Sequence, residues 1–282
     1  VVEALIKDHD GNLIEDAVLT SDPPPWWRAK KKNALFYNGM ARGDHRGTMA
    51  LATSLCVDTV ARAEEVDVAF KDIHAYVRSI TAPVWPRAIN ASLAAEGQTL
   101  FERDCAGCHG SYASDPTNDE ADSYPNLLLP LEVIGTDPVV AEGGVVHAPE
   151  LVEWYNGSFY GKRTRMEPSD PFPGYMAPPL DGIWPTAPYL HNGSVPSIEL
   201  VLNSAARPSV WRRVDDDSTN IDEEALGWPW LKVGQPQASL PDYEKPYVYD
   251  TSHWSQSKAG HIFGDHLSAA ERRAVVEYLK TL

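Results

Sequence analysis

The chain has 282 residues of ordinary globular composition, 43% hydrophobic and 23% charged, which excludes an intrinsically disordered protein. Its 40 acidic residues against 24 basic ones give a net charge of −16, which excludes nucleic acid as a partner because phosphates would be repelled. No stretch approaches the roughly 18 consecutive apolar residues that a transmembrane segment needs. The acidic balance instead favours a protein partner with a basic docking face.

Residues 1–82 form the first predicted unit. The chain begins at Val1 without the charged and apolar regions of a signal peptide, so we expect a processed chain or a fragment. Apolar residues at helical spacing from Val66 to Ile80 predict an amphipathic helix at the end of this unit. No Cys-x-x-Cys-His motif precedes that helix. Cys56 lies on an apolar stretch and is expected to be a buried core thiol.

A linker and then a second helix follow. Pro83 and Trp85-Pro86 indicate an interdomain linker over residues 83–92. The spacing after it predicts a helix over Leu93–Asp104, in which Gly97 would allow close approach of another helix. The expected partner is Tyr278.

Tyr278 belongs to the last predicted helix, which begins at Ser268. Glu271 stands three residues later and completes a capping box. Two helices that cross in this way are typical of a class I cytochrome c. Residues 1–82 end in a similar helix, so we expect them to be a partial second cytochrome-like domain. The sequence therefore predicts a mostly α-helical domain over residues 93–282, with long ordered loops, because residues 111–257 carry turn residues and little periodicity.

The motif Cys105-Ala106-Gly107-Cys108-His109 follows the first of these two helices directly. This spacing is typical of covalent haem c attachment, in which two thiols add to the haem vinyl groups and the histidine binds the iron. A zinc tetrad would need a second Cys-x-x-Cys, and a thioredoxin-like dithiol would need a βαβ setting. The sequence therefore predicts one covalent haem c, with Cys105, Cys108 and His109 as its attachment residues.

The second axial position has three candidates: Met176 in Gly174–Pro179, His191 in Thr186–Gly193, and His261 just before the last helix. The residues themselves leave this choice open. An iron with both axial positions filled would suit electron transfer, whereas an open position would suit catalysis.

Longer motifs resemble a known family. The run Asp181–Ser197, which contains Thr-Ala-Pro-Tyr-Leu-His-Asn-Gly-Ser, is similar to a signature of the bacterial dihaem cytochrome c peroxidase superfamily. The segments Lys30–His45 and Gly260–Gly264 are similar to its rubber-oxygenase-like branch. This resemblance implies a bis-histidine haem with His109 and His261 as its axial pair. It ranks Met176 second and His191 third.

These observations favour a c-type cytochrome that transfers single electrons, and the question whether the chain is an enzyme stays open. The alternative is the C-terminal portion of a dihaem peroxidase or oxygenase whose reactive haem is not in this sequence. Because bacteria attach haem c outside the cytoplasmic membrane, the expected location is periplasmic or extracellular. A redox protein partner is expected, and so is assembly as a subunit of a larger redox complex.

Overall fold

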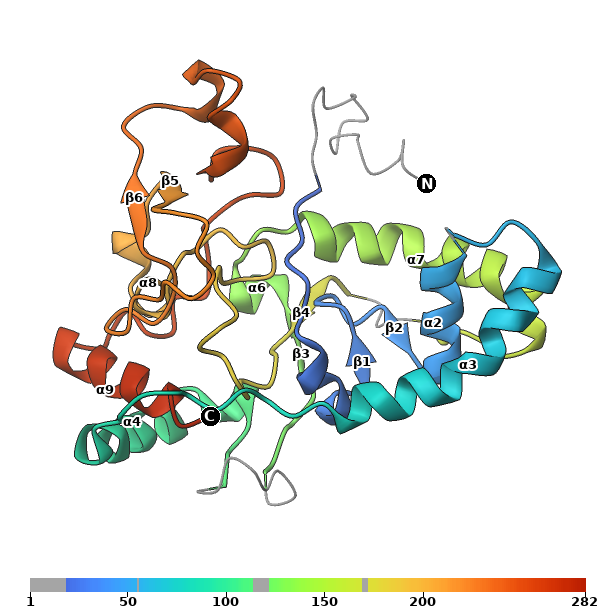
Figure 1. The fold of residues 1–282 in the computed structure, drawn as a ribbon, viewed down its shortest axis with the longest axis horizontal. Helices are drawn as coiled ribbons and strands as arrows, with labels where there is room; N and C mark the ends of the chain where they lie inside the picture. The colour runs from blue at the N-terminus through green and yellow to red at the C-terminus, as the bar shows by residue number, and fades with distance from the viewer. Residues whose placement is uncertain (1–18, 55, 114–121, 169–171) are drawn as a thin grey trace.

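The computed structural model describes residues 19–54, 56–113, 122–168 and 172–282, in which helices are separated by long loops and small sheets (Figure 1). The α-helices are α2 (His45–Thr53), α3 (Val60–Ser79), α4 (Ala91–Asp104), α5 (Ala106–His109), α6 (Leu131–Ile134), α7 (Val139–Gly157), α8 (Ile198–Val201) and α9 (Ala269–Leu279). Short 3-10 helices are η1 (Trp26–Lys31), η3 (Tyr160–Lys162), η4 (Ser204–Ala206), η5 (Gln237–Ser239) and η6 (Lys245–Tyr247). The prediction of a mostly α-helical fold is therefore confirmed only in part, because sheets and extensive loops accompany the helices.

The sheets are small and antiparallel. They pair β1 (Ala34–Leu35) with β2 (Ala41–Arg42), β3 (Leu128–Pro130) with β4 (Gly174–Met176), and the central β5 (Val210–Arg213) with β6 (Trp230–Lys232) and β7 (Val248–Asp250). In the second pair, Leu129 stands opposite Tyr175. This pairing holds Tyr175 and Met176 beside the cavity described below.

Helices α4 and α9 lie side by side at one end of the molecule (Figure 1). The crossing is closest at Gly97, where an added Cβ would lie 1.9 Å from the carbonyl oxygen of Ala274 and 2.9 Å from Tyr278 Cβ. The predicted capping box is present, since the Ser268 side chain accepts a hydrogen bond from Glu271 N and the Glu271 carboxylate accepts one from Ser268 N. The predicted helix pair and its glycine contact are confirmed.

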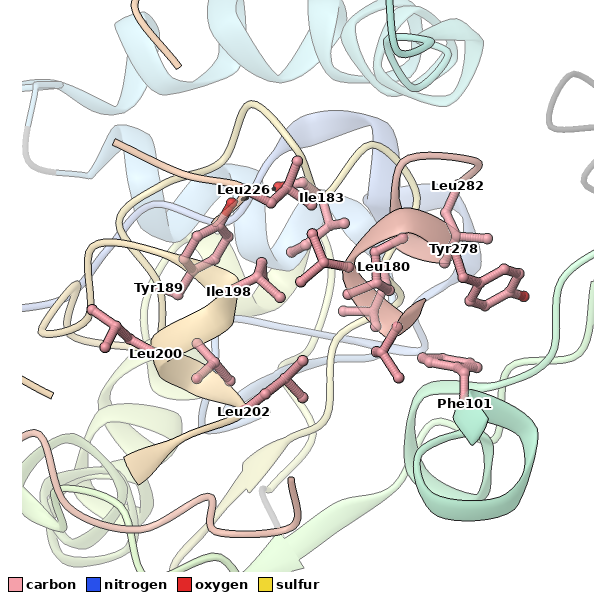
Figure 2. Close-up of a cluster of buried hydrophobic side chains, with 14 of the residues drawn as sticks. Phe101, Leu180, Ile183, Tyr189, Ile198, Leu200, Leu202, Leu226, Tyr278 and Leu282 are labelled. Carbon is pink, nitrogen blue, oxygen red and sulfur yellow. Dashed lines mark hydrogen bonds between the residues drawn. The ribbon is translucent and has the colours of Figure 1, made fainter. Parts of the chain in front are cut away.

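The main apolar core packs against this helix pair. Figure 2 shows Leu180, Ile183, Tyr189 and Ile198 grouped beside the end of α9, with Phe101 of α4 below Tyr278. Burial of each large apolar side chain contributes about 1.5–3 kcal/mol. This core therefore fixes the loop 180–202 against the two helices. Its buried members are Trp85, Phe101, Leu180, Ile183, Tyr189, Val195, Ile198, Leu200, Val201, Leu202, Leu226, Leu267, Val275, Val276, Tyr278, Leu279 and Leu282.

A smaller apolar cluster connects the N-terminal helices to a later part of the chain. It consists of Ala50 of α2, Phe70 of α3, Tyr155 of α7, and Met166. Residues before the predicted linker therefore share a core with residues after it. The predicted helix α3 is present, but Tyr76 of its apolar stripe is 70% exposed. Helix α3 contacts its neighbours through a narrower stripe than its sequence indicates.

The connections on either side of α3 have different environments. Cys56 lies between α2 and α3 and is exposed, so the prediction of a buried core thiol was wrong. The helix that would have buried it ends at Thr53. In the segment predicted as a linker, Trp85 is buried and meets Trp184 edge to face, with ring centres 5.4 Å apart. This segment is therefore anchored to the main core.

Residues 111–257 contain more regular structure than predicted. The 19-residue helix α7 was missed because Gly144 and Pro149 lie inside it, and both residue types disfavour helices. Asn38 packs where Gly144 has no side chain: an added Cβ would lie 2.6 Å from Asn38 Nδ2, which donates to the carbonyl of Val140. Tertiary packing has overridden the local propensity here.

Candidate functional site

A largely apolar cavity lies where α4, α5 and α9 meet the N-terminal segment and the loop around residue 261. It holds about 1310 Å³ of space between atoms, part of which is open to solvent. Every residue predicted to attach or coordinate haem contributes to its wall: Cys105, Cys108, His109, Met176, His191 and His261. The cavity therefore brings together residues that are up to 156 positions apart along the chain, from Cys105 to His261.

The two cysteines lie at the junction of α4 and α5. Cys105 ends α4, and its carbonyl accepts hydrogen bonds from the backbone N–H groups of Cys108 and His109. Both thiols are unpaired and half-buried. Burial raises the pKa of Cys105 to about 12 and also raises that of Cys108. Neither cysteine therefore has the lowered pKa that activates the thiolate of a redox dithiol.

His109 is held by a carbonyl oxygen of the loop after β4. Its Nδ1 lies 2.8 Å from the oxygen of Pro178, and because a carbonyl can only accept, Nδ1 carries the proton and donates it. Burial lowers the pKa of His109, so the ring is neutral. Nε2 then has a free lone pair, which is the state that a metal-binding imidazole requires.

His261 also lines the cavity. Its ring centre lies 6.2 Å from that of His109, and the two ring planes are inclined by 54°. Its φ of 45° is left-handed, a backbone conformation that non-glycine residues adopt only when the surroundings enforce it. His261 N donates to the carbonyl of Ile134 at 2.7 Å. Burial and the neighbouring His109 lower the pKa of His261 to about 4, so this ring is neutral too.

Arg207 fixes the backbone around His261. It is 4% exposed, and its guanidinium donates to the carbonyls of Lys258, Gly260 and His261. Further bonds from the same guanidinium reach Leu200 and Val201. Because the guanidinium is planar and rigid, these hydrogen bonds hold the loop around His261 in one conformation.

Met176 and His191 also border the cavity, but each is held by other contacts. An added Cβ on Gly39 would lie 3.2 Å from Met176 Sδ, so this sulfur packs against the N-terminal segment. The His191 ring stacks on Tyr175 with centres 3.9 Å apart, and burial lowers its pKa to about 3. In the described part of the chain, no group of three or more His, Cys, Asp or Glu gathers as a site for a bare metal ion.

Sequence reasoning missed the charged groups of the cavity. Asp22 and Arg28 both line it, and Arg207 braces its His261 loop. Arg28 belongs to the basic stretch Trp26–Lys32, where nothing in the sequence distinguishes the fully buried arginine from the half-buried lysines. The signal that identifies it, burial against Asp181, is tertiary.

Comparisons with known proteins are consistent with this geometry. Residues 174–212 match a family model described as RoxA-like, cytochrome c-like. The chain is 28% identical over 292 residues to uncharacterized protein y4iJ of Sinorhizobium fredii, covering 82% of this chain and 46% of that protein. It is 24% identical over 216 residues to y4iM of the same organism, covering 68% of this chain and 46% of that protein. The chain thus spans less than half the length of these relatives. The match supports a relationship to cytochromes c and, with it, haem binding.

Proposed function

We propose that this chain is a c-type cytochrome unit that carries one covalent haem and transfers single electrons outside the cytoplasm. Cys105 and Cys108 would form the thioether bonds, and His109 and His261 would bind the iron. The observation that carries the proposal is the placement of both histidine rings, 6.2 Å apart, in the cavity that the two thiols also line.

The side chains present fit this group. Two imidazoles that bind one metal ion from opposite sides have ring centres about 6 Å apart, because each metal–nitrogen bond is about 2 Å long. Both rings are neutral in the fold, which leaves a nitrogen lone pair available on each. Among the described residues, His261 Nδ1 is buried without a hydrogen-bond partner, and so is Nε2 of the alternative ligand His191. The mainly apolar walls suit a porphyrin face.

Haem bound here would supply a one-electron iron couple. The chain's own residues would keep both axial positions filled and exclude water from the ring faces. Pro178 holds the tautomer of His109, and Arg207 holds the loop that carries His261. With His109 and His261 both holding the iron, this arrangement would favour electron transfer over substrate chemistry.

A dihaem peroxidase or oxygenase is the second candidate. It is favoured by the resemblance of Asp181–Ser197 to that superfamily and by a chain that covers 46% of each curated relative. In that case residues 1–82 would be part of a second cytochrome-like domain and residues 93–282 the electron-transfer domain. The reactive haem would belong to sequence outside this chain.

The proposed location is periplasmic or extracellular, where bacteria attach haem c. Within the described ranges, no helix is both long and apolar enough to cross a membrane. The net charge of −16 supports a redox partner with a basic docking face, because opposite charges accelerate encounter. The same charge is compatible with a subunit of a larger redox complex.

The test combines haem counting with ligand access. We expect the denatured protein to have the mass of its polypeptide plus one haem, and the reduced protein to keep a low-spin spectrum under carbon monoxide. A chain purified from a haem c-producing host without any haem adduct would refute the cytochrome assignment. Rapid carbon monoxide binding would refute the bis-histidine site and favour the enzyme.

A further inference from the structure

Arg28 is a buried cation beside the candidate haem cavity. It lies in η1, is 4% exposed and lines the same cavity as Cys105 and His109. Its Nε donates to the carbonyl oxygen of Asp181 at 2.9 Å. Its Nη2 is buried and finds no hydrogen-bond partner in the described part of the chain. The Nη2 group of Arg28 can therefore still donate a hydrogen bond.

Two carboxyls lie close enough to act on Arg28, those of Asp181 and Asp22, but among the described contacts neither forms an ion pair with its guanidinium. A guanidinium stays protonated in proteins, and a buried charge is unfavourable unless it is paired. The Asp181 carboxylate already forms an ion pair with Lys31, which in turn also pairs with Asp122. Burial raises the pKa of the Asp22 carboxyl to about 7, so much of it is neutral near neutral pH. Burial lowers the pKa of a second cation, Lys32, to about 8, and the nearby Arg28 lowers it further.

We propose that Arg28 binds a propionate carboxylate of the haem, an inference that rests on the function proposed above. Haem carries two propionates on the edge of the ring away from its vinyl carbons, so they are free when the vinyl carbons bind cysteines. A carboxylate accepts the hydrogen bonds that a planar guanidinium offers, and charge assistance makes such bonds short and strong. The free Nη2 of Arg28 matches this requirement.

This contact would give the N-terminal segment a role in haem binding. Arg28 precedes the Cys-x-x-Cys-His motif by 77 residues, counted from Arg28 to Cys105. Through Arg28, η1 would set the charge balance at the haem edge. Loss of that positive charge would favour the oxidised iron and lower the reduction potential.

The experiment compares Arg28→Gln, which removes the charge, with Arg28→Lys, which keeps it. Arg87→Gln is the matched control, because Arg87 is 42% exposed at its side chain, pairs with Glu223 and does not line the cavity. Each protein is produced with haem labelled by ¹³C at the propionate carboxyls. Redox-difference infrared spectra then report the propionates, potentiometry reports the iron, and the mass of the denatured chain reports haem attachment.

We expect all variants to retain one covalent haem, since the cysteines are unchanged. Arg28→Gln should shift a propionate band and change the ratio of oxidised to reduced protein about tenfold at a fixed potential, or about 59 mV for one electron. Arg28→Lys should shift the band but keep most of the potential, whereas Arg87→Gln should change neither. Unchanged propionate bands in both Arg28 variants, with haem attached, would overturn the Arg28 proposal and leave the proposed function standing. A parent protein without haem would refute both.

Discussion

The substitution Gly97→Ala tests the helix crossing on which the cavity depends. The new Cβ would lie 1.9 Å from the carbonyl oxygen of Ala274, whereas non-bonded heavy atoms need about 3.5 Å. The obstacle is main chain of α9, so the two helices must separate by about 1.5 Å. Overpacking of this kind costs about 1–3 kcal/mol, and we expect the upper end because a helix backbone cannot rotate away. For a chain of this size, that lowers Tm by about 6–12 °C.

Guanidinium unfolding followed by far-UV circular dichroism measures this loss. The matched control is Gly157→Ala at the end of α7, where an added Cβ meets nothing within 4 Å. Alanine favours the helix there, so the control should be as stable as the parent or more stable by less than about 1 kcal/mol. If the free energy of unfolding of Gly97→Ala lay within about 0.5 kcal/mol of that of the parent, α4 and α9 would not cross as described.

Other substitutions address the site and its electrostatics. Cys105→Ala or Cys108→Ala should weaken covalent haem retention, measured by the mass of the denatured chain; full retention in both variants would contradict thioether attachment. His261→Gly should give a high-spin or ligand-accessible iron in absorption spectra, while the exposed His253→Gly should not; an unchanged low-spin spectrum would transfer the axial role to Met176 or His191. Burial raises the pKa of Asp22 from 3.8 to about 7, so the folded carboxyl keeps a proton that the unfolded one loses, and stability falls as the pH rises from about 4 to about 7. Asp22→Asn should therefore be more stable than the parent at pH 8 and similar to it at pH 4 in denaturant unfolding; an equal difference at both pH values would contradict this.

The parts of the fold that could be predicted have local signals. The capping box at Ser268 predicted the start of α9, and the residue spacing over 93–104 predicted α4, because each signal depends on a few neighbouring residues. The crossing of the two helices at Gly97 joins distant residues, and it was predicted from the arrangement typical of class I cytochromes c. Cys105, Cys108 and His109 could be identified from a local signal too, because they lie within five consecutive residues. Helix α7 could not be predicted, because Gly144 disfavours a helix locally. Its place in the helix is explained only by Asn38, a distant residue that packs against it.

The two buried arginines of the site, Arg28 and Arg207, could not be predicted, for a physical reason. Arginine is usually exposed, so Arg28 and Arg207 gave no sign of being buried. Their burial is stabilised by carbonyl oxygens of residues distant in the chain, such as Asp181 for Arg28 and Lys258 for Arg207. The proximity of His261 to His109 was implied by family resemblance and not by any spacing in the sequence.

The placement of the cavity between the two ends of the chain also sets an order of assembly. Arg28 and Leu279 line the same space, so its walls cannot close until the chain has been made at least as far as Leu279. Contacts between such distant residues form slowly, because long loops must close first. On the proposed function, Cys105 and Cys108 would therefore be accessible to haem-attaching enzymes before α9 packs against α4.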